Sequence, residues 1–263
     1  MAGTSGVTGT GGGVRRAVIL AAGRGARMGE LSDARPKCLT PLAGRALLDW
    51  QCDALRAAGV IEIAVVRGYR GEQLARPGLA SFENPRWATT NMVRSLLCAA
   101  PWLARETCIV AYGDIVYHPD TVAALAAADA DLAIAYDRLW RALWRERFDD
   151  PAGDAESFRV DAQGRVVDIG RPRPRLDATD GQYMGLLRIA PAAFAHIARL
   201  VAALDGPAGD RLDMTSLLRA LIAAGQPVLA VPVDGRWCEV DRESDVRLYE
   251  RRAGEAWSHD WRP

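Results

Sequence analysis

Short apolar runs alternate with longer amphipathic stretches along most of the chain, beginning at Val14. The first run, residues 16–22, is apolar on both faces and predicts a strand buried in a sheet. A glycine-rich loop follows to about Pro41, and residues 45–58 then repeat apolar positions at helical spacing up to Gly59. Because strands and helices alternate in this way, the pattern predicts βαβ units and an α/β fold with a mostly parallel sheet.

The same pattern continues through both halves of the chain and predicts further strands and helices. The expected strands are residues 61–66, 107–112, 131–136, 183–189 and 228–233. The expected helices are residues 90–103, 191–204, 213–224 and 242–252. Together they predict a Rossmann-like, mostly parallel mixed sheet that is flanked by helices.

The segment 137–181 departs from this pattern because it is rich in Arg, Asp, Trp and Pro. Its strand-like pieces are short, at residues 157–160 and 166–169, on either side of a turn. We interpret the segment as a small lobe inserted into a single domain of residues 14–263. We expect this lobe to bind a substrate, the acceptor discussed below. Residues 1–13 are rich in Gly, Ser and Thr and lack the basic and apolar pattern of a signal peptide, so they predict a disordered leader.

Composition and charge narrow the classes of function. The 263 residues are 49% hydrophobic and 25% charged, and a formal net charge of +0 gives no overall attraction to nucleic acid or an acidic membrane. Five cysteines without a CxxC pair favour a reducing compartment. No apolar run approaches the roughly 18 residues of a membrane helix. We therefore expect a cytoplasmic protein, and the sequence leaves open whether it forms a homodimer.

The first chemical motif lies directly after the first expected strand. It reads LAAGRGARMG over residues 20–29 and is followed by RPKCL over residues 35–39. Glycines after a buried strand let backbone N–H groups approach an anion, and Arg and Lys supply the matching charge, which suits a triphosphate. The motif is not a P-loop, because Gly29 is followed by Glu30, and it fails the GxGxxG dinucleotide pattern at Met28.

This two-part motif resembles the signature of the nucleotidyltransferases that make sugar nucleotides and CDP-alcohols. The resemblance implies a nucleotide-diphospho-sugar transferase-like fold in which the loop wraps the nucleotide phosphates. It also implies that Arg27 and Lys37 are catalytic residues that bind and neutralise the triphosphate. The loop residues that it places on the nucleotide are Leu20, Ala21, Ala22, Gly23, Arg24 and Gly25. The alternative is a glycine-rich turn with solvated basic residues.

Carboxylates that could hold a metal lie at two places. Asp114 follows Gly113 at the end of an expected strand, where open α/β sheets place their sites. Glu239 and Asp241 are two residues apart, so in an extended segment both point to the same side. Mg²⁺ prefers such oxygen ligands, and the resemblance implies that Asp114 and Asp241 coordinate it, with Glu239 as a third candidate. A turn role for Asp114 and a helix N-cap role for Asp241 are the alternatives.

Residues 84–96 read NPRWATTNMVRSL and are polar before they become apolar. Amide and hydroxyl groups at a helix start can donate to and accept from a base edge. The stretch resembles the cytidylyltransferase branch of the family, whose members activate phosphocholine and small phosphonates such as 2-aminoethylphosphonate, and it therefore favours CTP. The residues expected at the nucleotide here and at the central strand are Asn84, Thr90, Asn91, Ser95 and Gly113. A capped helix without base contacts is the alternative.

The inserted segment supplies most of the residues expected to bind the acceptor. Arg side chains can grip a phosphonate or phosphate, and Trp faces with nearby carboxylates can bind an ammonium group. Trp140 and Trp144 are four residues apart and share a helix face, so a packing stripe beside a solvated Arg face is the alternative. The candidates are Tyr136, Arg138, Trp140, Trp144, Arg147 and Glu156, with Tyr183 added from the resemblance.

These residues predict a Mg²⁺-dependent transfer of CMP from CTP to a small phosphonate or phosphomonoester, with release of pyrophosphate. An acceptor oxygen that is already ionised needs no general base, so positioning and charge neutralisation account for catalysis. Two other functions remain open. One is a phosphocholine cytidylyltransferase or sugar-1-phosphate nucleotidyltransferase, and the other is a non-catalytic regulatory protein of the same fold.

Overall fold

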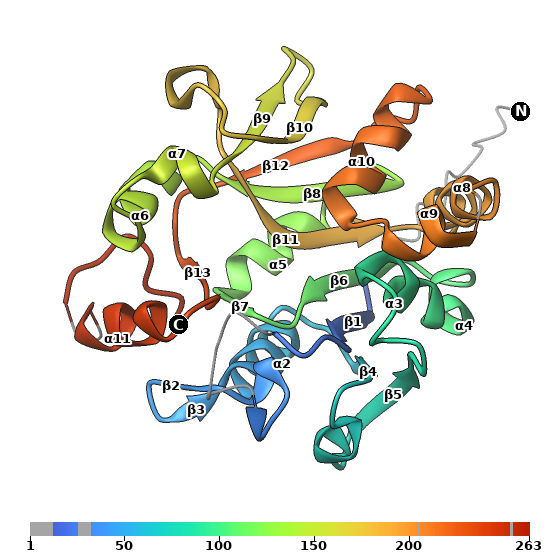
Figure 1. The fold of residues 1–263 in the computed structure, drawn as a ribbon, viewed down its shortest axis with the longest axis horizontal. Coiled ribbons are helices and arrows are strands. Elements are labelled where there is room, and N and C mark those ends of the chain that lie inside the picture. Colours follow the sequence, from blue (N-terminus) through green and yellow to red (C-terminus); the bar gives the residue numbers. More distant parts are fainter. Residues whose placement is uncertain (1–12, 26–32, 205, 253–254) are drawn as a thin grey trace, which may run out of the picture.

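A seven-stranded sheet forms the centre of the computed structural model, which describes residues 13–25, 33–204, 206–252 and 255–263 (Figure 1). The strand order is β12-β8-β11-β6-β1-β4-β5. Strand β11 runs antiparallel to both neighbours, and the other pairs are parallel. The strands are β1 (Arg16–Ala21), β4 (Glu62–Arg67), β5 (Leu79–Glu83), β6 (Cys108–Tyr112), β8 (Leu132–Asp137), β11 (Gln182–Ile189) and β12 (Leu229–Val233). This sheet confirms the predicted α/β fold.

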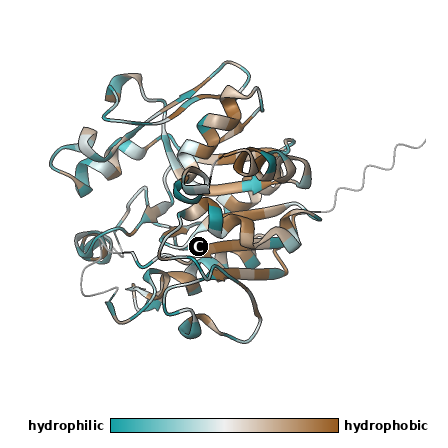
Figure 2. Ribbon diagram, turned by 45° about the vertical axis from the view of Figure 1, so that its right-hand side comes forward, coloured by the Kyte–Doolittle hydropathy of each residue, from teal (hydrophilic) through white to brown (hydrophobic). Residues whose placement is uncertain are grey.

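Different helices cover the two faces of the sheet because side chains alternate along each strand. In β1, Ile19 faces one core, whereas Val18 and Leu20 face the other. The first core is closed by α2 (Leu47–Ala57) and α5 (Pro119–Ala126). The second core is closed by α3 (Met92–Cys98), α8 (Pro191–Ala202) and α10 (Met214–Ala223). Figure 2 shows the apolar residues gathered along the strands, with hydrophilic residues on the outer sides of the helices.

The helix expected at residues 90–103 is divided in two, as α3 and α4 (Ala100–Leu103). Pro101 lies in the first turn of α4 and has no backbone N–H, so it begins a new helix more readily than it continues one. The helix expected at residues 45–58 begins only at Leu47, because β3 (Arg45–Ala46) pairs with β2 (Pro41–Leu42).

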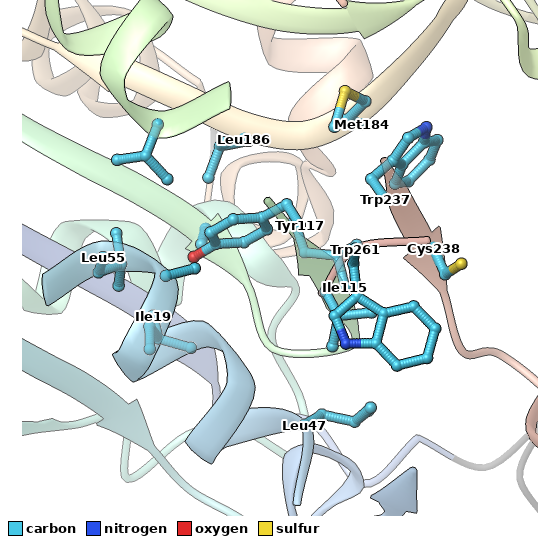
Figure 3. Packing of buried hydrophobic residues seen from close by; sticks show 14 of the residues in the cluster. Ile19, Leu47, Leu55, Ile115, Tyr117, Met184, Leu186, Trp237, Cys238 and Trp261 are labelled. Atoms are coloured by element: carbon cyan, nitrogen blue, oxygen red, sulfur yellow. The ribbon is translucent and has the colours of Figure 1, made fainter. Parts of the chain in front are cut away.

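Several elements lie outside the predicted set. Among them are the edge strand β5, which carries too few apolar residues to be recognised, and the helix α5. The two short strands β7 (Ile115–Tyr117) and β13 (Trp237–Glu239) form a separate antiparallel pair. Figure 3 shows how Ile115 and Tyr117 of β7, Trp237 and Cys238 of β13, and Trp261 near the C-terminus gather in one core.

Residues 137–181 hold α6 (Trp140–Arg147), α7 (Pro151–Asp154) and a two-stranded sheet of β9 (Glu156–Val160) and β10 (Val166–Pro172). Helix α6 packs against α11 (Glu243–Arg252) beside the central sheet (Figure 1). The acceptor-binding role of this segment and the single-domain organisation stay predictions. Residues 1–12 of the expected leader lie outside the described residues.

The remaining described elements are short turns of helix and one further helix. They are η2 (Lys37–Leu39), η3 (Gly71–Leu74), η4 (Leu176–Ala178) and α9 (Gly206–Arg211). None of the described helices combines the length and the apolar composition that a membrane span requires.

A buried carboxylate joins β8 to β13 and to the C-terminal segment. Asp137 is fully buried, and its Oδ1 accepts the backbone N–H groups of Leu139 and Gly235, both at 2.8 Å. Its Oδ2 lies 3.0 Å from Nε1 of Trp237 and 2.9 Å from Nε2 of His259. Four polar groups therefore depend on one side chain, and three of them lie about 100 residues or more along the chain from it.

We expect Asp137→Ala to lower the free energy of unfolding by about 3 to 5 kcal/mol, since it leaves several buried donors without a partner. Urea denaturation followed by tryptophan fluorescence measures this change. Asp177→Ala removes an exposed carboxylate that is paired with Arg175, and it should leave the denaturation midpoint nearly unchanged. Equal midpoints for the two variants would show that the Asp137 contacts do not hold the fold together.

Candidate active site

Three carboxylates meet at the carboxyl end of β6. Asp114 follows β6, Glu239 ends β13, and Asp241 lies just before α11. The pairing of β13 with β7 brings these segments together, and the backbone N–H of Val240 donates to the carbonyl oxygen of Asp114 at 2.9 Å. Ligand oxygens of the three side chains lie within 4.8 Å of one another. The structure thus brings together the three residues that the sequence marked for a metal.

Gly113 allows Asp114 to lie beside the end of β1. Its N–H donates to the carbonyl oxygen of Leu20 at 3.0 Å. A Cβ at this position would lie 2.9 Å from that same oxygen, a distance that real Cβ atoms do not reach. Only glycine therefore fits here, and the strand end carrying Asp114 stays in contact with the glycine-rich loop.

Lys37 lies between two of the carboxylates. Its Nζ is 2.7 Å from Oδ2 of Asp114 and 2.5 Å from Oδ1 of Asp241. Burial by itself lowers the pKa of this ammonium, but the charges of Asp114 and Asp241 outweigh burial and raise the pKa above its usual value. Gly25, at φ +68°, leaves room for the lysine stem, because a Cβ there would lie 2.9 Å from the lysine Cβ.

Glu239, the third carboxylate of the cluster, has a raised pKa. Burial, with the charge of Asp241 as the next cause, raises the pKa of Glu239 to about 8, while Arg147 opposes the change. Its backbone carbonyl accepts the hydroxyl of Tyr249 at 2.8 Å, which fixes the strand end. A further cation near the cluster would favour the ionised form of Glu239.

The donor set suits a divalent cation such as Mg²⁺, which prefers carboxylate oxygens. Oδ1 of Asp114 is buried and has no hydrogen-bond partner among the described residues, although its Oδ2 contacts Lys37. A buried carboxylate oxygen without a donor is costly unless a ligand satisfies it. Asp114, Glu239 and Asp241 are the residues that would hold the ion.

Three cavities share Met92 in their lining, and two of them include residues of this cluster. The first, of about 280 Å³, extends from the glycine-rich loop to Lys37 and Asp114. The second, of about 120 Å³, lies between the loop and the start of α3. The third, of about 410 Å³, lies on the other side of Met92 and includes Glu239 and Asp241. Met92 lines all three cavities and marks the point where they meet.

Most of the residues predicted to bind the nucleotide line the first two cavities. In the first cavity these are Leu20, Ala21, Gly23, Gly25, Lys37 and Gly113. In the second they are Leu20, Ala22, Gly23, Thr90, Asn91 and Ser95. Arg27 lies outside the described residues, so its role stays a prediction.

The structure places Arg24 and Asn84 outside the lining of these two cavities. Arg24 is exposed and pairs with Asp33 at 2.8 Å, so a surface carboxylate balances its charge. Asn84 is buried, and its amide donates to Oγ1 of Thr90 at 3.0 Å and to Oγ of Ser95 at 3.1 Å. Asn84 therefore orients two residues of the second cavity without reaching it.

Of the residues predicted to bind the acceptor, Trp144, Glu156 and Tyr183 line the third cavity. Tyr136, Arg138 and Trp140 do not belong to its lining. The ring of Tyr136 stacks on Phe158 in the core, and Trp140 is fully buried against Trp144, as the packing alternative expected. Arg138 is exposed and pairs with Asp234 through both nitrogens of its fork.

Arg147 lies elsewhere than predicted, behind the carboxylates. Its side chain has 0% exposure, and it contacts Asp245 through two bonds of 3.1 Å and Glu239 at 3.2 Å. The guanidinium also lies over the rings of Trp144 and Phe148, each at 4.8 Å. With its charge balanced by Asp245 and Glu239, Arg147 supports the cluster, and it does not line the third cavity.

Several lining residues were not predicted. Trp87 lies before the helix expected at residues 90–103, and Met92 lies within it. Asp213 opens the helix expected at residues 213–224, where its Oδ1 accepts the backbone N–H of Ser216 at 2.7 Å. Asp154 and Trp237 stand next to predicted residues in the sequence, and that proximity was the only available signal. The unpredicted residues of the third cavity are Met92, Tyr112, Asp154, Gln182, Met184, Gly185, Asp213, Met214, Thr215 and Trp237.

We expect Arg147→Ala to lower the free energy of unfolding by about 3 to 5 kcal/mol, because it leaves Asp245 and Glu239 buried without their cation. Urea denaturation of this variant and of Arg138→Ala is the measurement. Arg138 comes from the same segment but forms an exposed pair, so its removal should leave the denaturation midpoint almost unchanged. A stable Arg147→Ala protein that binds its acceptor poorly would instead restore Arg147 as an acceptor ligand.

Known proteins resemble the chain in sequence. A model of the MobA-like NTP transferase domain matches residues 17–156. CTP:phosphoglutamine cytidylyltransferase of Campylobacter jejuni subsp. jejuni is 33% identical, over 88% of this chain and 98% of that protein. CMP-5'-(3-aminopropyl)phosphonate synthase of Streptomyces rubellomurinus is 37% identical over 90% of this chain, which spans 38% of that longer protein.

Solved structures share the fold. The inositol-1-phosphate CTP transferase from T. maritima has a TM-score of 0.70 at 19% identity and covers 94% of this chain and 99% of its own. CTP:phosphocholine cytidylyltransferase from Streptococcus pneumoniae has a TM-score of 0.70 at 20% identity and covers 91% of this chain and 100% of its own. The family model spans more than half of the sequence, and the Campylobacter relative aligns along nearly all of it. These matches confirm the resemblance in the glycine-rich motif: the chain belongs to the MobA-like NTP transferase family and is a nucleotidyltransferase.

Proposed function

We propose that the chain is a cytidylyltransferase that transfers CMP from CTP to a small phosphonate or phosphomonoester and releases pyrophosphate. The observation that carries the proposal is a set of three cavities that share Met92, two of which contain residues of the cluster of Lys37, Asp114 and Asp241. One cavity suits the triphosphate, one the base and one the acceptor. The names of relatives from Campylobacter and Streptomyces support a cytidine nucleotide.

The triphosphate suits the first cavity. Gly23 and Gly25 line it without side chains, so backbone N–H groups can approach phosphate oxygens. Lys37 lines the same cavity and supplies a compact positive charge. The lysine is thus within reach of the phosphates and of the carboxylates at the reacting centre.

The base suits the second cavity, whose volume of about 120 Å³ favours a small ring. Oγ of Ser95 accepts a hydrogen bond from Asn84, so its own proton is free to be donated toward the cavity. The oxygen and the unprotonated ring nitrogen of cytosine are acceptors for such a donor. Trp87 adds an aromatic wall beside this donor.

Two observations favour Mg²⁺ at the carboxylate cluster. Three carboxylates can supply oxygen ligands, and the buried Oδ1 of Asp114 has no hydrogen-bond partner among the described residues. When bound, the ion would offset negative charge on the nucleotide and on the departing pyrophosphate. The residues of the chain hold the reactants on either side of the cluster. Their alignment converts a reaction between two anions into one within a single complex.

The reaction itself needs one bond formed and one broken. An acceptor phosphonate or phosphate oxygen attacks the α-phosphorus of CTP, and the bond from that phosphorus to the bridging oxygen of pyrophosphate breaks. The attacking oxygen is already ionised near pH 7, so no side chain has to remove a proton. Lys37 neutralises charge as it develops, which is the largest contribution that the described residues can make.

The acceptor should carry a positive charge at the end that does not react. The third cavity presents carboxylates and aromatic rings, and its described lining contains neither lysine nor arginine. Oxygen atoms of Glu156, Gln182 and Thr215 can accept hydrogen bonds from a primary ammonium group, whereas a quaternary ammonium has no N–H to donate. The acidic residues of this cavity are Asp154, Glu156, Asp213, Glu239 and Asp241.

These features favour an aminoalkylphosphonate such as 2-aminoethylphosphonate, or a phosphomonoester with a primary amine. The amine in the printed name of the Streptomyces relative supports the same class. Phosphocholine and sugar 1-phosphates remain the alternatives. A sugar 1-phosphate offers no cation to the acidic wall, so the cavity disfavours it.

The decisive experiment measures pyrophosphate release with each of the four common NTPs and a panel of acceptors. We expect turnover with CTP and an amine-bearing phosphonate in the presence of Mg²⁺. Lys37→Ala and Asp114→Ala should each lower kcat at least about 100-fold, because each removes charge at the reacting centre. Circular dichroism confirms that the variants are folded. Near-normal turnover in either variant, or no turnover with any acceptor, contradicts the proposal, and the second result favours a regulatory role.

Acceptor recognition is tested with Glu156→Gln and Asp213→Asn. Both remove a charge from the third cavity, and Asn keeps the helix N-cap that Asp213 provides. We expect each variant to raise the KM for 2-aminoethylphosphonate about 10-fold, the effect of losing one charge-assisted hydrogen bond. The KM for ethylphosphonate, which lacks the amine, should not rise. If the KM values for both acceptors rise equally, Glu156 and Asp213 do not recognise the amine.

A further inference from the structure

Lys37 is the one lysine of the chain. The sequence contains 33 lysine and arginine residues, and all of the others are arginine. An ammonium group is a compact charge with three donors, whereas a guanidinium is a wide planar fork. The position between Asp114 and Asp241 requires the compact form, because it lies within 2.7 Å of one oxygen and 2.5 Å of the other.

The same two oxygens belong to the carboxylates that would hold a divalent cation. Protein ligands hold Mg²⁺ at about 2.1 Å. An ammonium in hydrogen-bond contact with those oxygens would therefore stand next to the ion. Both groups are cations in a partly enclosed site, where the side chain of Lys37 is only 12% exposed and water screens their repulsion poorly. Electrostatic repulsion therefore disfavours simultaneous contact of the lysine and the ion with these carboxylates.

We propose that Lys37 is the internal counter-ion of the metal carboxylates and that it exchanges with the divalent cation, moving to the triphosphate as the metal and the nucleotide enter. The inference rests on the proposed function for the identity of the nucleotide. It goes beyond that function, because it makes binding of the metal and binding of the triphosphate favour each other. Without the triphosphate, the ion must separate Lys37 from two partners and offers no new one.

The surroundings of Lys37 permit this movement. The lysine lines the first cavity as well as contacting the carboxylates, so the phosphates lie on the path of its flexible stem. Gly25 packs against that stem and has no side chain that would block it. Three donors on the ammonium can be transferred from carboxylate oxygens to phosphate oxygens without loss of charge pairing.

The first test measures binding of Mn²⁺ alone, by electron paramagnetic resonance, to the wild-type chain and to Lys37→Met. Methionine keeps the length of the side chain and removes the charge. We expect Lys37→Met to bind Mn²⁺ at least about 10-fold more tightly than wild type in the absence of nucleotide. Arg138→Met, which removes an exposed cation, should match wild type. Equal or weaker binding by Lys37→Met overturns the proposal.

The second test adds α,β-methylene-CTP, which binds without reacting. It should strengthen Mn²⁺ binding to wild type by a larger factor than to Lys37→Met, because only wild type gains a new partner for the lysine. Equal factors overturn the coupling. The Mn²⁺ measurement without nucleotide does not depend on the identity of the substrate. It therefore separates a failure of this inference from a failure of the proposed function.

A third measurement uses the wild-type protein and does not depend on a folded variant. With one lysine in the chain, ¹⁵N-lysine labelling gives a single side-chain Nζ resonance. We expect this resonance to shift when Mg²⁺ and α,β-methylene-CTP are added together, as the ammonium leaves the carboxylates. An unchanged resonance, while calorimetry shows that both have bound, overturns the proposal.

Discussion

Three carboxylates within 4.8 Å of one another repel strongly, and the functional end of this fold depends on the two cations that balance them. Lys37 approaches from the glycine-rich loop side and contacts Asp114 and Asp241. Arg147 approaches from behind and contacts Glu239. Each cation comes from a different part of the chain, so the cluster joins the segment after β1, helix α6 and the start of the last helix into one site.

The buried arginine also links the third cavity to the carboxylate cluster. Arg147 and Trp144 lie on the same helix, α6, three residues apart. Trp144 lines the third cavity, while Arg147 contacts Asp245, whose Oδ2 accepts the backbone N–H groups of Asp241 and Arg242 at 2.8 and 3.0 Å. Helix α6 thereby lines the third cavity with one side chain, and with another it supports the segment that carries Asp241.

The charge of the site is divided between its compartments. The first cavity contains the lysine and backbone donors and suits an anion, whereas the third contains carboxylates and aromatic rings and suits a cation. A zwitterionic acceptor would be oriented by this difference, with its phosphonate toward the cluster and its amine away from it. Orientation of this kind fits a mechanism that depends on positioning more than on proton transfer.

The sequence by itself determined the alternation of strands and helices, the glycine-rich loop, and the carboxylates at 114, 239 and 241. Such features are visible because each follows from local chemistry: apolar periodicity, glycine after a strand, and acidic residues at strand ends. The sequence also predicted most residues of the nucleotide cavities. Only the tertiary structure decided the contacts of Arg147 and Asn84 and which carboxylates line the third cavity. A charged side chain in a polar stretch looks the same whether it faces solvent, a substrate or a buried partner, and its partner, Asp245 for Arg147, lies 98 residues away along the chain.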